Sequence, residues 1–172
     1  EARLGPGAAG TGEAALALRV MDARSVKPAV AATRDRETFH AFLLFKARRY
    51  EAASGAYRAL LKRSDASPRD RADYALGLAR AARGLHDFEA TDSAFSLAAS
   101  LDSAGATGET AAWERAREWE DRKPPEAAVA MIRWARPLIR TEALAAAARV
   151  HEAIAWIRAD SLAAARAALS GP

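Results

Sequence analysis

A recurring interval between small residues constrains the fold of this 172-residue chain more than any other feature of its sequence. The intervals are 38, 36 and 37 residues, and they separate Ala53, Thr91, Ala127 and Ala164. Four positions after each of these come Tyr57, Phe95, Met131 and Ala168. A small side chain lets two helices cross closely, and a larger one a turn later can fill the space toward the next pair of helices. The period therefore predicts helical hairpins that stack and bury one another's faces.

The composition agrees with helices. Alanine dominates the apolar residues, and arginine outnumbers lysine by 22 to 4. Both alanine and arginine favour helices, whereas the β-branched and aromatic residues that favour strands are sparse. Hydrophobic residues make up 51% of the chain, which is enough for a buried core. The absence of cysteine excludes disulfides, thiolate metal sites and a cysteine nucleophile.

Apolar periodicity and punctuation predict helices over residues 13–23, 33–47, 50–63, 68–83, 88–101, 109–121, 125–136, 142–158 and 161–169. The clearest helix start is Ser67-Pro68-Arg69-Asp70, where serine can cap and proline suits the first turn. Gly84 suits a left-handed residue after the end of that helix. Pro137 is expected to end a helix.

These elements predict an all-α fold of about four stacked antiparallel hairpins, at residues 34–63, 68–101, 109–136 and 142–169. An irregular helical bundle is the alternative. Residues 1–12, which are rich in glycine, are expected to form a flexible linker, and residues 13–172 a single helical repeat domain. Every long apolar run is interrupted by a charged residue, so no transmembrane segment is expected.

Two segments resemble the tetratricopeptide repeat family. The run Tyr50-Glu51-Ala52-Ala53, followed by Tyr57-Arg58-Ala59-Leu60-Leu61, is similar to the aromatic, small, aromatic order of that family's second helix. The run from Phe88 to Asp102 is similar, including its closing Leu-Asp pair. The spacing of 36–38 residues exceeds the family's usual 34, and Ser103 stands where a proline is expected. The resemblance covers residues 34–103 and weakens over residues 109–170.

The resemblance implies that a partner binds the concave surface built from the first helices of the hairpins. When the family's groove-facing positions are carried over by aligning the repeats on Ala53 and Thr91, they fall on Phe42, Phe45, Lys46, Arg80 and Arg83. Cations at such positions would suit an acidic segment or a terminal carboxylate. The alternative is that the aromatic residues belong to the core and that the cations are only solvated.

Catalytic motifs are missing from the sequence. It contains no nucleophile elbow, phosphate-binding loop or dinucleotide-binding glycine pattern. The histidines His40, His86 and His151 are far apart in sequence and are expected at helix surfaces or caps. The acidic residues Glu114, Glu118, Glu120 and Asp121 are expected on a solvated helix face. We therefore expect no enzymatic activity, cofactor or metal.

All four tryptophans lie in the second half of the chain, at Trp113, Trp119, Trp134 and Trp156. Their expected role is to fill space where the repeat pattern is weak, and the alternative is an exposed binding face.

The charges are unevenly distributed along the chain. Net charge is +5 over residues 34–71, −6 over 72–121 and +4 over 122–172. An acidic middle section disfavours nucleic acid, because binding a duplex needs a continuous basic track. The pattern suits a protein partner of complementary charge. The hypothesis is thus a scaffold or accessory subunit of a larger assembly, including one at a membrane that it joins peripherally.

The alternative hypothesis is an Arg-rich helical module that binds nucleic acid or has a regulatory role, using residues 46–71. The first residue is Glu1 rather than methionine, a start that suits a mature chain after removal of an export signal and favours an extracytoplasmic location.

Overall fold

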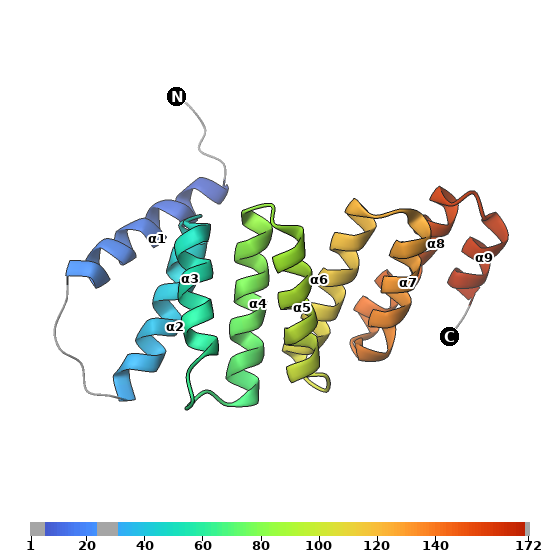
Figure 1. Ribbon diagram of the computed structural model, residues 1–172. Helices are drawn as coiled ribbons and strands as arrows, with labels where there is room; N and C mark the ends of the chain where they lie inside the picture. Colours follow the sequence, from blue (N-terminus) through green and yellow to red (C-terminus); the bar gives the residue numbers. More distant parts are fainter. Residues whose placement is uncertain (1–5, 24–30, 171–172) are drawn as a thin grey trace, which may run out of the picture. The chain divides into compact units, whose positions relative to one another are not determined.

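The computed structural model describes residues 6–23 and 31–170, and these residues form helices and no strand (Figure 1). The α-helices are α1 (Pro6–Ala23), α2 (Ala31–Lys46), α3 (Tyr50–Leu61), α4 (Pro68–Gly84), α5 (Phe88–Leu101), α6 (Ala106–Arg122), α7 (Pro125–Ala135), α8 (Glu142–Arg158) and α9 (Leu162–Ser170). A short 3-10 helix, η1 (Arg136–Leu138), follows α7. The all-α prediction is confirmed, and the start of α4 is as expected, since Ser67 and Asp70 form a reciprocal capping box.

The predicted linker is wrong for residues 6–12. Helix α1 begins at Pro6 and includes this glycine-rich stretch. Proline suits the first helical position because its missing N–H would have no partner there, and its fixed φ is already helical. Residues 1–5 of the predicted linker lie outside the described residues.

Three of the turns inside the hairpins are built alike. Arg48, His86 and Asp160 have φ angles of 58°, 59° and 55°. In each turn the next residue's N–H donates to a carbonyl five residues earlier, at 2.9, 3.1 and 2.9 Å for Arg49, Asp87 and Ser161. This is the hydrogen bond of a Schellman motif, with the left-handed residue at C′.

Gly84 therefore does not have the predicted role, because it is the last residue of α4 and the left-handed residue is His86. Its lack of a side chain serves packing instead. A Cβ at Gly84 would lie 2.6 Å from Cγ of Tyr50.

The turn between α6 and α7 differs from the other three. Lys123 follows α6 directly but is extended, with φ −114° and ψ 162°. Pro124 follows it, and a residue before proline is driven toward extended conformations. Pro125 then starts α7 at its first position.

The predicted repeat register is wrong by one residue in the second half of the chain. Ala127 and Ala164 are only partly buried, whereas Ala128 and Ala165 are buried. The buried series Ala53, Thr91, Ala128 and Ala165 has intervals of 38, 37 and 37 residues. Ile132 then replaces Met131 as the buried residue one turn later.

With this register the first helices repeat as well. Twelve residues before each member of this buried series lie Ala41, Ala79, Ala116 and Ala153, and all four are buried. An alanine in the first helix and a small residue in the second allow the two helices of a hairpin to approach closely. The pattern of small buried residues therefore extends over all four hairpins.

The chain divides into two compact units, residues 1–94 and 95–172, which are described separately. In the first unit α1 packs on α2, α2 on α3 and α3 on α4 (Figure 1). Its core is formed by buried residues of these four helices and of the loop before α4, namely Ala14, Leu18, Ala41, Leu43, Leu44, Ala53, Tyr57, Leu60, Ala66, Tyr74 and Ala81. The single domain over residues 13–172 stays a prediction.

In the second unit α6 packs on α7, α7 on α8 and α8 on α9 (Figure 1). Glu109 of α6 accepts hydrogen bonds from the backbone N–H groups of Arg140 and Thr141, at 2.9 and 2.7 Å, and so caps the start of α8. Burial opposes ionisation of Glu109, but these hydrogen bonds outweigh it, and the pKa of Glu109 is lowered. A carboxylate at this helix start also complements its dipole.

A buried carboxylate joins α7 to α8. Glu152 is 1% exposed and accepts from Arg133 at 2.7 Å and from Arg136 at 3.3 Å. Arg133 belongs to α7, and Arg136, three residues later, is the first residue of η1. Pairing of this kind offsets the cost of removing a carboxylate from water.

The prediction of a solvated acidic face on α6 is wrong for two residues. Glu118 and Glu120 are buried. Glu118 accepts from Arg122 at 3.1 Å, and Glu120 accepts from Arg117 at 2.9 Å and contacts His151. Their arginine partners lie one turn away on the same helix, a spacing that allows pairing even where the carboxylate is covered by a neighbouring helix.

Candidate functional site: a groove on α2 and α4

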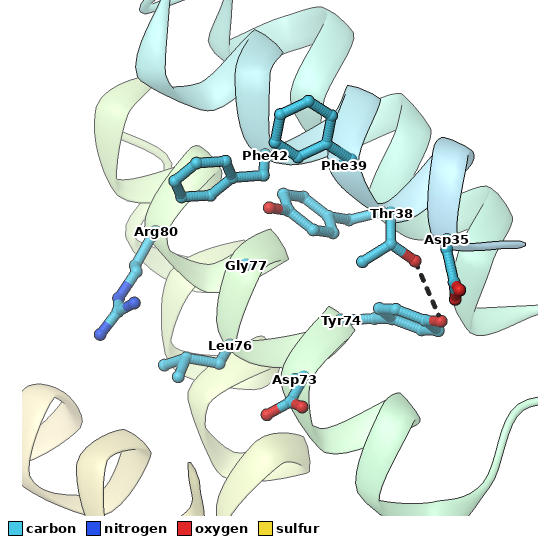
Figure 2. Close-up of a pocket in the computed structure, with 10 residues that line it drawn as sticks. Asp35, Thr38, Phe39, Phe42, Asp73, Tyr74, Leu76, Gly77 and Arg80 are labelled. Atoms are coloured by element: carbon cyan, nitrogen blue, oxygen red, sulfur yellow. Dashed lines mark hydrogen bonds between the residues drawn. The ribbon is translucent and has the colours of Figure 1, made fainter. Parts of the chain in front are cut away.

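A groove of about 480 Å³ lies on the first unit, along α2 and α4. It is lined by Asp35, Thr38, Phe39, Phe42, Tyr57, Asp73, Tyr74, Leu76, Gly77 and Arg80 (Figure 2). All of these except Tyr57 of α3 belong to the first helices of the first two hairpins. This is the surface on which the resemblance placed a partner.

The two sides of the groove are equivalent positions of consecutive repeats. Positions 35, 38, 39 and 42 of α2 become positions 73, 76, 77 and 80 of α4 after the 38-residue interval. The residue at the first position is aspartate in both repeats, whereas Phe42 is replaced by Arg80. The repeat thus places two acidic residues at one height along α2 and α4, and an aromatic residue and a cation about two turns further along these helices. These two heights are called the acidic and basic levels of the groove.

Two tyrosines form the floor of the groove. Tyr74 is buried, and its hydroxyl accepts a hydrogen bond of 3.2 Å from the Thr38 hydroxyl, drawn in Figure 2. The ring of Tyr57 packs against Gly77, where a Cβ would lie 2.5 Å from Cε1. Burial raises the pKa of the Tyr57 hydroxyl, and the positive charge of Arg80 lowers it in part. The charge of Arg80 therefore acts at the floor of the groove.

Phe39 and Phe42 form an exposed aromatic pair at the rim. Their ring centroids lie 6.5 Å apart at an interplanar angle of 25°. The two residues are 52% and 46% exposed. The ammonium of Lys46 lies 5.9 Å from the centroid of the Phe42 ring. Stacked aromatic rings that remain exposed are typical of surfaces that bind another molecule.

The predicted site residues divide into two groups. Phe42 and Arg80 line the groove. Phe45, Lys46 and Arg83 are not among its lining residues, and Phe45 packs against the core with its ring 5.9 Å from that of Tyr50. Phe45 follows the buried residue Leu44 on α2, and its contact with the first residue of α3 explains its partial burial.

Sequence reasoning missed the carboxylates and the second aromatic of the groove. Asp35, Asp73 and Phe39 line it but were not predicted as site residues. Asp35 and Asp73 could have been found from the 38-residue interval, which relates them directly, had the groove positions been compared across the two repeats.

The tryptophans of the second unit lie at helix contacts and at one partly exposed position. Trp113 meets the His151 ring edge-on with a centroid distance of 5.3 Å. Arg115 lies 4.6 Å from the ring centroid of Trp134, which is 39% exposed. Within residues 6–23 and 31–170, no three histidine, aspartate or glutamate side chains gather as metal ligands would.

Comparisons with solved structures find helical repeats. A Podosopora anserina protein described as a kinesin light chain with nearly identical TPR-like repeats is 13% identical, with a TM-score of 0.69 over 92% of this chain and 84% of that one. BtubC (BKLC) from P. vanneervenii is 15% identical, with a TM-score of 0.64 over 96% of this chain and 71% of that one. The chain has a tetratricopeptide-like repeat fold. At these identities the likeness concerns the fold alone.

A single-residue variant of the same Podosopora anserina protein gives a TM-score of 0.68 at 13% identity, over 92% of this chain and 84% of that one. No protein-family model matches this tetratricopeptide-like chain, and no curated protein does. Among the helices that the structure describes, none is both long and apolar enough to cross a bilayer.

Proposed function

We propose that this chain is a protein-interaction scaffold that binds a segment of another protein in the groove on α2 and α4. The observation that carries the proposal is the exposed Phe39–Phe42 pair beside that groove. Burying two aromatic rings against a partner removes a large apolar area from water, which stabilises a complex. The buried tyrosines beneath hold the groove's floor in place, so little ordering is needed on binding.

The proposal includes a role as an accessory subunit of a larger assembly, whether free or attached to a membrane, with no catalysis by this chain. A protein partner fits the groove better than nucleic acid does. Asp35 and Asp73 line it, and carboxylates at the surface of contact would repel a phosphate backbone.

The substitution Phe42→Ala tests the proposal. Phe42 is half exposed, so the change should alter the stability of the free protein little, while it removes aromatic surface from the complex. Affinity for a partner that co-purifies with the native chain should fall at least tenfold, as measured by calorimetry. Arg58→Ala on the exposed side of α3 is the matched control, and its affinity should be unchanged. Equal affinities of the Phe42→Ala variant and the native chain would refute a partner site in this groove.

A further inference from the structure

The charges along the groove are separated by sign. Asp35 and Asp73 lie in the early turns of α2 and α4, and Arg80 lies seven residues beyond Asp73 on α4. At a rise of about 1.5 Å per residue, the acidic and basic levels of the groove are roughly 10 Å apart. Figure 2 shows Asp35 and Asp73 at one end of the groove and Arg80 beside Phe42 at the other.

The acidic end is open to solvent. The Asp35 side chain is 88% exposed, although its carboxylate lies 3.8 Å from Arg34 of the same helix. Asp73 is also exposed. Both aspartates therefore lie at the solvent-exposed surface, and the repeat interval places them at corresponding positions of the two repeats.

The apolar surface lies between the charged levels. Phe39 is one turn beyond Asp35, and Leu76 lies between Asp73 and Arg80 on α4. A partner side chain resting there would contact Phe39, Leu76 and the Tyr57 ring. The order along the groove is acidic, apolar, basic.

We propose that the groove binds a short segment of a protein in which an apolar residue stands between a basic and an acidic residue. The basic side chain lies at Asp35 and Asp73, and the acidic side chain lies at Arg80. This inference rests on the proposed function and gives the chemistry of the partner. It departs from the acidic segment that the resemblance implied, because a uniformly acidic segment would bring like charge to Asp35 and Asp73.

The distance between the charged levels sets the spacing in the partner. An extended segment covers about 10 Å in three residues, and a helical one in about seven. Side-chain contacts fix which charge lies at which end of the groove and not the direction of the partner chain. Both orders of the two charges therefore belong in the test.

The test uses the whole chain and fluorescein-labelled synthetic peptides, with affinity measured by fluorescence anisotropy at low salt. Each peptide carries one leucine between two charged positions, spaced three or seven residues apart. The charge pairs are Lys–Asp, Asp–Lys, Asp–Asp and Lys–Lys, at equal length. Exposed ion pairs typically change affinity about two- to fivefold each, so the best charge-separated peptide should bind roughly tenfold more tightly than either like-charged peptide. The advantage should shrink at high salt.

Neutral variants assign each charge to its end of the groove. In Asp35→Asn/Asp73→Asn, replacing the peptide's lysine by glutamine should no longer weaken binding, while its aspartate should still matter. In Arg80→Gln the reverse is expected. Glu51→Gln and Arg58→Gln, at exposed positions of α3 outside the groove, should preserve both preferences.

The outcomes separate this inference from the proposed function. If the Asp–Asp peptide binds as tightly as the charge-separated ones, or if the Asp35→Asn/Asp73→Asn variant keeps its preference for lysine, the charge order is wrong. If such binding is still lost in Phe42→Ala, the groove remains the binding site and only its charge preference fails. If no peptide binds and Phe42→Ala has no effect on a co-purified partner, both proposals fail.

Discussion

Gly77 gives a test in which local helix propensity and packing predict opposite results. Gly77 lies inside α4 and Gly55 inside α3, and alanine at either position gains about 1 kcal/mol of helix propensity over glycine. Nothing lies within 4 Å of a Cβ built on Gly55, whereas a Cβ on Gly77 would lie 2.5 Å from Cε1 of Tyr57. The Tyr57 ring is buried and has little room to withdraw.

Helix propensity and packing against the Tyr57 ring together set the expected changes in stability. Overpacking a filled site typically costs about 1–3 kcal/mol, so Gly77→Ala should lower the free energy of unfolding by about 1 kcal/mol after the gain in propensity. Gly55→Ala should raise it by about 1 kcal/mol. The difference between the two variants, about 1–3 kcal/mol, isolates the contact with Tyr57.

Urea unfolding followed by far-UV circular dichroism measures both variants under the same conditions. The same substitution in a Tyr57→Leu background completes a double-mutant cycle, and Gly77→Ala should there become neutral or stabilising because the ring tip is gone. A Gly77→Ala variant as stable as Gly55→Ala, or a cycle without coupling, would show that the Tyr57 ring does not require glycine at position 77.

Two further predictions concern the second unit. Glu109→Gln should destabilise the protein by about 1–2 kcal/mol at neutral pH, because a charged cap of α8 is lost. The folded-state pKa of Glu109 lies below its ordinary value of 4.5, so the stabilisation by its charge is fully present above pH 4.5 and is lost as the pH falls through the folded-state pKa. Denaturant unfolding of the native chain and of Glu109→Gln at pH 7 and at pH 3 measures this. An equal difference in the free energy of unfolding at the two pH values would contradict the prediction. Arg133→Ala/Arg136→Ala leaves Glu152 buried without these cations and should cost about 2–3 kcal/mol, less than a fully buried pair because Arg133 is 58% exposed. Adding Glu152→Gln should restore part of the loss, and no recovery in denaturant unfolding would argue against the ion pair as its cause.

The helices and their order were predictable because proline, glycine and capping residues punctuate strongly periodic segments. The register of the last two hairpins was not predicted, because alanines stand side by side at positions 127–128 and 163–165. Spacing alone does not tell which alanine of such a run faces the neighbouring helix. The alanines of the first helices identify the buried alanine in each run, since only Ala128 and Ala165 have an alanine twelve residues earlier, at positions 116 and 153.

The turns show a different limit of sequence reasoning. The left-handed positions hold arginine, histidine and aspartate, so no glycine marks them. Their regular interval follows from the hairpin geometry, which forces the conformation on whichever residue is there. Gly84, which the sequence suggested as the left-handed residue, is needed for packing instead, because a Cβ there would clash with the Tyr50 ring.

The candidate groove follows from the sequence in part. Phe42 and Arg80 follow from the repeat register, because position 42 in the first repeat becomes position 80 in the second. Phe45 packs against the core instead of lining the groove, since a periodic apolar residue in a short helix can face either the core or a partner. The groove's aspartates were overlooked because the groove positions of the two repeats were not compared, although the 38-residue interval relates Asp35 directly to Asp73.

The central claim, that a protein partner occupies the groove on α2 and α4, is tested most directly by cross-linking the native chain in its purified complex with an amine-reactive reagent. Lys46 lies beside Phe42 at the rim, whereas Lys62 follows the last residue of α3. Mass spectrometry should find partner cross-links at Lys46 in preference to Lys62, and Phe42→Ala should strongly reduce them while Gly55→Ala retains them. A chain that purifies as a monomer without a partner, or cross-links that are undiminished in Phe42→Ala, would contradict the claim.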